Sequence, residues 1–184
     1  MDIKIDISDI SLETPRLLLR PFAMADMEDF FEYASVPGVG EMAGWNHHES
    51  MEDTRRVLEM FLEEKNVFAV VHKSDNKVIG SVGLHVANTD GTVYENLPAK
   101  EIGYVLSKTY WGQGYMPEAA KAVIKYCFAV LNAELMTVGH YEGNAQSKRV
   151  IEKCGFSFWR TYDSEKHGKR VHEYILNRQC MGEG

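Results

Sequence analysis

The chain has 184 residues, of which 45% are hydrophobic and 26% are charged, and its formal net charge is −7. This length and composition predict a single globular domain with a full hydrophobic core, spanning residues 1–184. The acidic balance disfavours nucleic acid as a partner, because phosphate backbones require a basic face. It is compatible with a cationic or amine-bearing partner.

The cysteines and the start of the chain indicate the compartment. Cys127, Cys154 and Cys180 are scattered and have no CxxC spacing, which argues against a disulfide framework and fits a reducing environment. The opening MDIKIDISDI is acidic and alternating, unlike a signal peptide, and no apolar run approaches the 18 residues of a membrane span. We therefore expect a cytoplasmic protein with no membrane contact.

The first third of the chain predicts a strand and two helices. Leu17 to Leu19 form an apolar run typical of a buried strand. The spacing of apolar residues from Met27 to Ala34 predicts a helix. Residues 36–44 are punctuated by glycine and proline and predict an irregular segment. A second helix follows, with Ser50 and Asp53 as a capping pair and an apolar stripe formed by Val57, Leu58, Phe61 and Leu62.

The middle of the chain predicts a hairpin and a further strand. Residues 67–71 and 78–86 are β-rich, and the turn-prone Ser74, Asp75 and Asn76 separate them. Residues 88–98 predict a loop, and residues 101–107 (EIGYVLS) predict the next strand.

The last third begins with YWGQGYMPEAA at residues 110–120. Pro117 suits the first position of a helix whose inward stripe is Ala120, Val123, Ile124, Cys127 and Leu131. Residues 136–140 predict a strand, after which Asn144 caps a short helix that ends at Gly155. Residues 156–162 and 171–176 predict a final hairpin. The order of elements indicates a mixed α/β fold in one compact unit.

The glycine-rich corner WGQGY joins a predicted strand to a predicted helix. Such a corner leaves several backbone N–H groups unpaired, and the helix dipole adds partial positive charge, so that it can bind a phosphate or pyrophosphate. Gly112 and Gly114 allow the backbone to approach a ligand closely. The corner lacks the GK[ST] of a P-loop and the third glycine of a dinucleotide fingerprint. A tight turn without a ligand is the alternative for so short a pattern.

Several motifs in order make the pattern more specific: TPRLLLRPF at 14–22, VIGSVGLH at 78–85, EIGYVLS at 101–107, WGQGYMPEA at 111–119 and NAQSKRVIEKCGF at 144–156. With them the chain resembles the Gcn5-related N-acetyltransferase (GNAT) superfamily over nearly its whole length, and particularly the branch of ribosomal-protein N-terminal acetyltransferases. The resemblance implies a single α/β (α+β) domain. Its mixed, mostly antiparallel central sheet would contain a splayed strand pair and carry helices on both faces.

The resemblance also implies a cofactor site for acetyl-CoA and no metal. Backbone amides of the corner would cradle the pyrophosphate, by position Gly112, Gln113, Gly114, Tyr115 and Met116. The pantetheine arm would insert between the splayed strands and pair with backbone near Tyr104, Val105 and Leu106. Asn144 matches an asparagine that contacts the pantetheine or acetyl end.

Two residues are candidates for proton transfer. Acetyl transfer to an amine needs a group that accepts the amine proton and a proton for the leaving thiolate, while a backbone N–H can serve as the oxyanion donor. Glu101 is the candidate base, because it opens the strand that would hold the thioester and shares a face with Gly103 and Val105. Ser147 is the candidate proton donor, since helical spacing places it on the inward stripe of its helix. A solvated carboxylate and a helix-terminal hydroxyl are the structural alternatives.

The sequence departs from the superfamily pattern at three positions. Many relatives have a tyrosine proton donor in Y-E-K-x-G-F, where this chain has Ile151, which cannot donate. Trp111 replaces the usual Gln or Arg at the start of the corner, and Met116 replaces a Gly or Ala. These substitutions predict a crowded cofactor entry.

Other residues suggest structural roles. Cys127 and Cys154 lie on apolar stripes and are expected in the core. The adjacent His47 and His48 do not share a helical face as a metal pair would. With Trp45 they lie between the first two helices, where the resemblance implies part of the acceptor pocket; contact with substrate is the alternative, and we expect surface residues of a loop.

The leading hypothesis is an acetyl-CoA-dependent N-acetyltransferase that uses direct transfer in a ternary complex. Its acceptor is a primary amine, either a protein N-terminus or a small amine, and assembly as a homodimer is left open. The alternative is a non-catalytic sensor or scaffold that binds CoA or an acyl-CoA. An interaction domain with a vestigial pocket is a third hypothesis, which predicts no CoA affinity.

Overall fold

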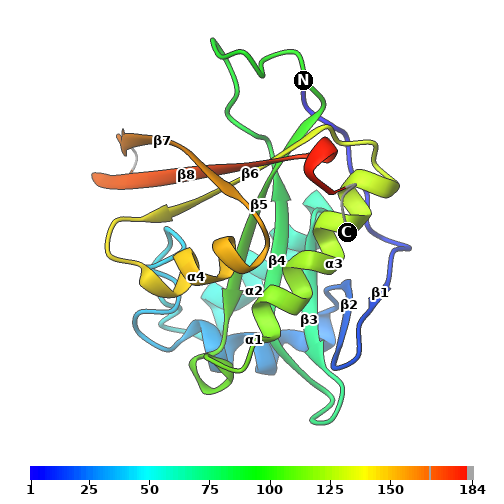
Figure 1. The fold of residues 1–184 in the computed structure, drawn as a ribbon. Coiled ribbons are helices and arrows are strands. Elements are labelled where there is room, and N and C mark those ends of the chain that lie inside the picture. Colours follow the sequence, from blue (N-terminus) through cyan, green and yellow to red (C-terminus); the bar gives the residue numbers. More distant parts are fainter. Residues whose placement is uncertain (166, 182–184) are drawn as a thin grey trace.

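The computed structural model describes residues 1–165 and 167–181, which form four α-helices around an eight-stranded sheet (Figure 1). The helices are α1 (Met27–Ala34), α2 (Met51–Glu64), α3 (Tyr115–Ala129) and α4 (Ala145–Lys153). The strands are β1 (Leu12–Glu13), β2 (Leu17–Pro21), β3 (Val67–His72), β4 (Lys77–His85), β5 (Ala99–Leu106), β6 (Leu135–Tyr141), β7 (Ser157–Ser164) and β8 (Lys169–Asn177). The elements expected from the sequence are present, with most ends within two residues of the prediction, and β1 is an addition.

The sheet is mixed and mostly antiparallel, with the strand order β1-β2-β3-β4-β5-β6-β8-β7. Only β5 and β6 are parallel neighbours, and they pair only from Ala99 to Glu101 on β5. Beyond Glu101, β5 continues beside β4 as far as Leu106, whereas β6 continues beside β8 as far as Tyr141. The two strands therefore diverge, which confirms the expected splayed pair.

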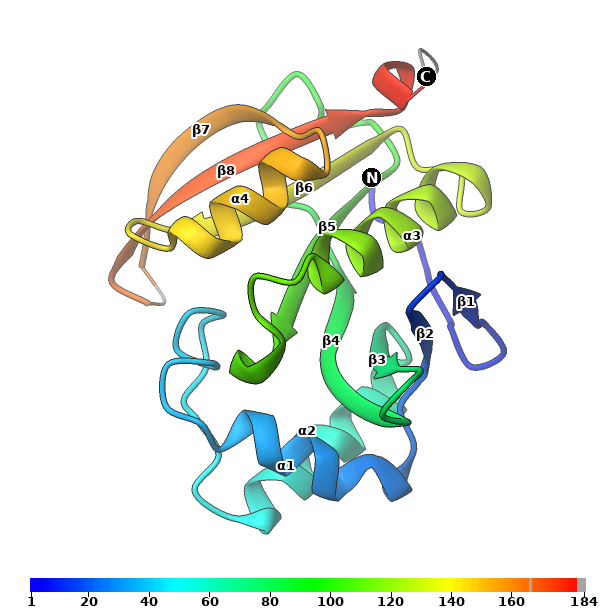
Figure 2. The ribbon, with the colours of Figure 1, turned by 60° about the horizontal axis from the view of Figure 1, so that its bottom comes forward.

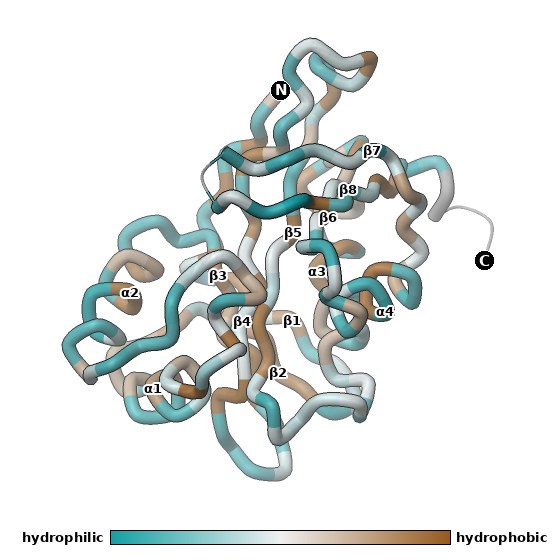
Figure 3. Tube along the Cα trace, turned by 90° about the vertical axis from the view of Figure 1, so that its left-hand side faces the viewer, coloured by the Kyte–Doolittle hydropathy of each residue, from teal (hydrophilic) through white to brown (hydrophobic). Residues whose placement is uncertain are grey.

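Helices cover both faces of the sheet (Figure 2). On one face, α3 packs on a core that includes Phe68 and Val70 of β3. On the other face, α1 and α2 pack on a core that includes Ala69 and Val71. All six residues of β3 are buried, because alternate side chains serve the two cores. Figure 3 shows hydrophobic residues along the central strands and hydrophilic residues on the outer turns of α2.

Side-chain caps define the starts of two helices. Ser50 and Asp53 form a reciprocal capping box at α2, in which the Ser50 oxygen accepts from the Asp53 N–H and the Asp53 carboxylate accepts from the Ser50 N–H. Asn144 caps α4 by accepting a hydrogen bond from the Ser147 N–H at 3.1 Å. Both caps confirm the sequence prediction.

The start of α3 corrects the sequence analysis. The helix begins at Tyr115, and its N-cap is Gly114 in the left-handed conformation, so Pro117 is its third residue rather than its first. Proline is tolerated there because an N–H at position 117 would have no partner within the helix. The first N–H that donates to a carbonyl four residues back is that of Glu118, which bonds to Gly114. The corner therefore passes directly into the helix. Leu131 lies beyond the helix end and packs against the core from the following segment.

Within the described residues, no helix is both long and apolar enough to cross a membrane.

Candidate active site

The glycine corner has the backbone geometry of an anion site. Gly112 and Gly114 have φ values of 77° and 81°, a left-handed region that costs other residues about 1–2 kcal/mol. Gly114 is the N-cap of α3, so the first amides of that 15-residue helix are free of helical partners. The Trp111 indole donates to the Leu106 carbonyl at 2.8 Å and fixes the corner against the end of β5.

Thr14 and Arg16, near the start of the chain, hold the glycine corner through Gln113 and Glu118, and we call this set of contacts the clamp. The Arg16 guanidinium donates to the Gln113 carbonyl at 3.0 Å and to the Glu118 carboxylate at 2.7 Å. Glu118 also accepts from the Thr14 hydroxyl at 2.6 Å and from the Arg16 N–H at 2.9 Å. The N–H and C=O groups of a trans peptide point in opposite directions. The hydrogen bond from Arg16 to the Gln113 carbonyl therefore turns the N–H of the next residue, Gly114, away from Arg16.

Loss of this clamp should destabilise the protein. Burial raises the pKa of Glu118, but the bonds from Thr14 and Arg16 outweigh it and leave the pKa below its ordinary value. We expect Glu118→Ala to lower the free energy of unfolding by about 1–3 kcal/mol. The Thr14 hydroxyl and the N–H groups of Arg16 would lose their acceptor at a partly buried site.

Urea denaturation would measure this effect. Glu152→Ala is the matched control, since Glu152 pairs with Lys148 at 3.9 Å on an exposed helix surface and should contribute little. If the two variants lost the same free energy of unfolding, the clamp would not stabilise the protein.

A cavity of about 1200 Å³ extends along the divergence of β5 and β6. One side of it is lined by the corner, including Gly112 and Gly114, and by the start of α3. The other side is lined by residues of the 39–49 segment and of α2. Glu101 and Tyr104 of β5 line the stretch between these two sides.

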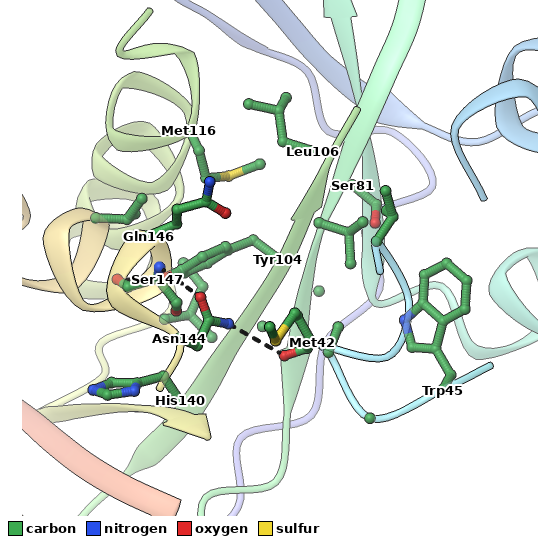
Figure 4. Close-up of a pocket in the computed structure, with 18 of the residues that line it drawn as sticks. Met42, Trp45, Ser81, Tyr104, Leu106, Met116, His140, Asn144, Gln146 and Ser147 are labelled. Carbon is green, nitrogen blue, oxygen red and sulfur yellow. Dashed lines mark hydrogen bonds between the residues drawn. The ribbon is translucent and has the colours of Figure 1, made fainter. Parts of the chain in front are cut away.

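Tyr104 and Ser147 form a pair of hydroxyl groups in this cavity (Figure 4). The Tyr104 Oη lies 2.9 Å from the Ser147 Oγ and donates to the Ser147 carbonyl at 3.2 Å. Burial raises the pKa of Tyr104, so its hydroxyl stays protonated at neutral pH. Asn144 lies beside the pair, and its amide nitrogen is 3.5 Å from the Met42 carbonyl on the opposite wall. The family resemblance implies only a backbone contact for Tyr104. Strand alternation could have placed its side chain on the face covered by α3 and α4.

Glu101 lies at the point where β5 leaves β6. It is opposite His85 on β4 and opposite Thr137 on β6. Burial and, to a smaller extent, the nearby Glu173 carboxylate raise its pKa to about 7, against the opposing effect of Arg160. Arg160 is itself held by Glu173 at 2.6 Å. A carboxyl group with this pKa can both accept and release a proton near neutrality.

The segment before α2 corrects a second expectation. His48 is buried, and its ring nitrogen lies 2.9 Å from the Thr54 hydroxyl. Trp45 is half-buried, packs against the α1–α2 core and lies 5.2 Å from the His48 ring. His47 pairs with Glu41 at 2.7 Å and is partly exposed. Trp45 and His48 are thus packed rather than surface residues, because the 36–48 segment folds back onto α1. All three residues line the cavity.

The structure brings together most residues selected from the sequence. Ten of them line the cavity, and they are Glu101, Tyr104, Val105, Leu106, Gly112, Gly114, Tyr115, Met116, Asn144 and Ser147. Gln113 is not among the lining residues, because its side chain folds back to the Thr109 carbonyl at 3.1 Å. Met116 is buried against the α3 core. Ile151 is buried as well and has no part in the lining.

The described cysteines are core residues, as expected. Burial raises the pKa of Cys127 to about 12 and that of Cys154 to about 11, so neither is a thiolate at neutral pH. The side chain of Cys180 lies outside the described part of the chain. Among the described side chains, no group of three or more His, Cys, Asp or Glu could hold a metal ion.

The splayed strand pair, with a glycine corner that opens α3 beside it, is the arrangement expected of an acyltransferase, and the family comparison gives the same class. Residues 16–157 match the family described as the acetyltransferase (GNAT) domain, which is more than half of the chain. The chain belongs to the GNAT family and is an N-acetyltransferase. The resemblance predicted from the sequence is confirmed.

Relatives of known sequence or structure agree with this assignment. The chain is 27% identical over 183 residues to the uncharacterized N-acetyltransferase p20 of Bacillus licheniformis, covering 94% of this chain and 99% of that protein. A GNAT-family acetyltransferase structure from Bacillus anthracis has a TM-score of 0.81 and 25% identity over 92% of this chain and 99% of that one. A ribosomal-protein-S5-alanine acetyltransferase from Vibrio fischeri shares the fold, with a TM-score of 0.68 and 20% identity over 92% and 97% of the two chains.

Proposed function

We propose that this protein transfers an acetyl group from acetyl-CoA to a primary amine by direct attack in a ternary complex. One observation carries the proposal: a continuous cavity joins the glycine corner to Glu101, whose pKa of about 7 suits a general base. The donor and acceptor sites therefore meet at a group that can take a proton. The acceptor is a protein N-terminus or a small amine, and the 184 residues form one acetyltransferase domain.

The residues present fit acetyl-CoA. The corner offers unpaired amides and a helix N-terminus for the pyrophosphate, with Gly112, Gly114, Tyr115 and Met116 in the lining. From Ile102 to Leu106, β5 pairs with β4 on one edge and has no strand partner on the other among the described residues. That free edge can pair with the amides of an extended pantetheine arm, near Tyr104, Val105 and Leu106. The backbone amide of Gln113 and the side chain of Asn144 complete the proposed site for acetyl-CoA.

The chemistry can be divided among side chains of this cavity. Acetyl-CoA supplies an activated thioester. Glu101 accepts a proton from the incoming ammonium group and leaves a nucleophilic amine. A backbone N–H on the free edge of β5 stabilises the negative charge that develops on the carbonyl oxygen. The Tyr104–Ser147 pair donates the proton that the leaving thiolate requires, in place of the tyrosine that Ile151 replaces.

The proton-donor role predicts a modest and non-additive effect. We expect Ser147→Ala and Tyr104→Phe each to lower kcat roughly tenfold to a hundredfold, and the double variant to be little worse than either. The reason is that the two hydroxyls act as one chain. Ser157→Ala, in an exposed position on β7, is the control. Independent, multiplicative losses would show that the hydroxyls do not act together.

The proposal is tested by binding and then by turnover. Calorimetric titration should show saturable binding of acetyl-CoA and of CoA, but not of ATP. Mass spectrometry should then detect an acetylated product from a panel of 2-phenylethylamine, spermidine and a tetrapeptide with a free N-terminus. Binding without transfer to any panel member would favour the non-catalytic sensor. No binding would favour the interaction domain with a vestigial pocket.

A further inference from the structure

The proton balance of the reaction requires a second proton acceptor, to which no residue has yet been assigned. An amine that arrives protonated loses two protons from nitrogen when it becomes an amide. Glu101 accounts for the first, which must leave before the nitrogen can attack. The second is lost as the C–N bond forms, when Glu101 is already protonated and the Tyr104–Ser147 pair is giving its own proton to the thiolate, so neither accepts it in that step.

A histidine lies beside Glu101 on the same face of the sheet. His85 of β4 is directly opposite Glu101 of β5 in the antiparallel register. Side chains at such paired positions lie on one face with Cβ atoms about 4.5–5.5 Å apart. Both residues line the cavity, and the His85 side chain is exposed within it rather than packed into either core.

The next pair along the two strands is Gly83 opposite Gly103. A Cβ on Gly83 would lie only 2.7 Å from His85 Nε2, and a Cβ on Gly103 would lie 3.3 Å from the same atom. The imidazole therefore lies over a floor made by two glycines. Neither glycine has a positive φ, so their backbone conformation does not require glycine. Space for the ring, and for whatever approaches the strands beside it, is the physical reason for both.

His85 lies close to the place proposed for the thioester. Gly103 is on the same face as Glu101, two residues further toward the free edge that would hold the thioester. The ring is thus held between the proposed base and the proposed reaction centre, on the side of the cavity lined by α2.

We propose that His85 is a second catalytic base, which receives through Nε2 the proton released as the acceptor nitrogen bonds to the acetyl carbon. The inference rests on the proposed function. The C–N bond forms and the C–S bond breaks, while the Tyr104–Ser147 pair gives a proton to the thiolate. Protonated His85 and the deprotonated hydroxyl pair then exchange a proton through solvent, and Glu101 releases its proton to solvent, so that amide, free thiol and one proton are the products.

The surroundings keep His85 in the state that this role requires. Although the ring is open to the cavity, the surrounding protein atoms partly desolvate it and lower its pKa; the charge of Glu64 opposes this shift and that of Lys100 adds to it. The imidazole is therefore neutral at pH 7 and can accept a proton.

The test compares His85→Ala and His85→Gln with the wild-type protein, using the panel amine that gives the highest turnover. We expect kcat to fall about a hundredfold or more, with the Kd for acetyl-CoA changed less than twofold. Added imidazole should restore acetylated product in His85→Ala but not in His85→Gln, since only the smaller side chain leaves room for it. Val86→Ala, at the adjacent exposed position, should have wild-type kcat.

The outcomes separate this inference from the proposed function. If Glu101→Gln lowers turnover while both His85 variants retain it, the second-base role is wrong and the transferase stands. Lost turnover with no response of His85→Ala to imidazole also overturns it, because a purely structural role would give that result. Absence of transfer by the wild-type protein would overturn the proposed function and the inference with it.

Discussion

Replacement of Glu101 by Gln should lower kcat about 10²- to 10⁴-fold and leave the Kd for acetyl-CoA unchanged. Glutamine preserves the shape of the side chain but cannot accept a proton, while the corner and the free edge of β5 are untouched. Steady-state kinetics and calorimetry would measure the two quantities separately. Glu59→Gln, on the exposed surface of α2, is the control. Unchanged turnover in Glu101→Gln would remove this carboxylate from the mechanism.

The pH profile gives an independent readout of the same residue. Glu101 accepts a proton only when ionised, and its pKa is raised to about 7. Turnover in the wild-type protein should therefore increase as pH rises through about 7, and this acidic limb should be absent from the residual activity of Glu101→Gln. Glu173→Gln should move the limb to lower pH, because the neighbouring negative charge that raises the pKa is removed. A limb that persists in Glu101→Gln would belong to another group.

Replacement of Gly114 by Ala should weaken acetyl-CoA binding at least tenfold and destabilise the protein. At φ of 81°, a residue with a Cβ costs about 1–2 kcal/mol, which the chain would relieve by turning the peptide away from its left-handed conformation. The nearest atom to the added Cβ would be Arg16 Nη2 at 3.6 Å, an ordinary contact, so the effect arises from the backbone rather than from a clash. Calorimetry would give the Kd, and urea denaturation the stability.

Gly91→Ala provides a matched control for the backbone strain. Gly91 has φ of 67° in the loop between β4 and β5, and an added Cβ there would meet no atom within 4 Å. It should lose similar stability and bind acetyl-CoA normally. If Gly114→Ala also bound the cofactor normally, the corner would be a structural turn and not a pyrophosphate clamp.

Local signals explain what the sequence predicted well. The Ser50–Asp53 box and the Asn144 cap depend on residues three positions apart, and both are present. The two cores follow from alternation within each strand. The one clear error at a helix end, at Pro117, arose because glycine in the left-handed conformation can begin a helix earlier than proline indicates.

The sequence by itself determined the order of elements, the glycine corner and two candidate side chains, Glu101 and Ser147, because each depends on residues near one another in the chain. It also determined the family, because five such local motifs occur in a fixed order along the chain. The tertiary structure decided everything that depends on which segments meet. It placed the Tyr104 hydroxyl beside Ser147, 43 residues away, and Arg16 behind the Gln113 carbonyl, 97 residues away. It raised the pKa of Glu101 by burying it beside Glu173, and it laid His85 over two glycines. Burial, register and charge proximity are properties of the packed sheet, so no local pattern could have specified them.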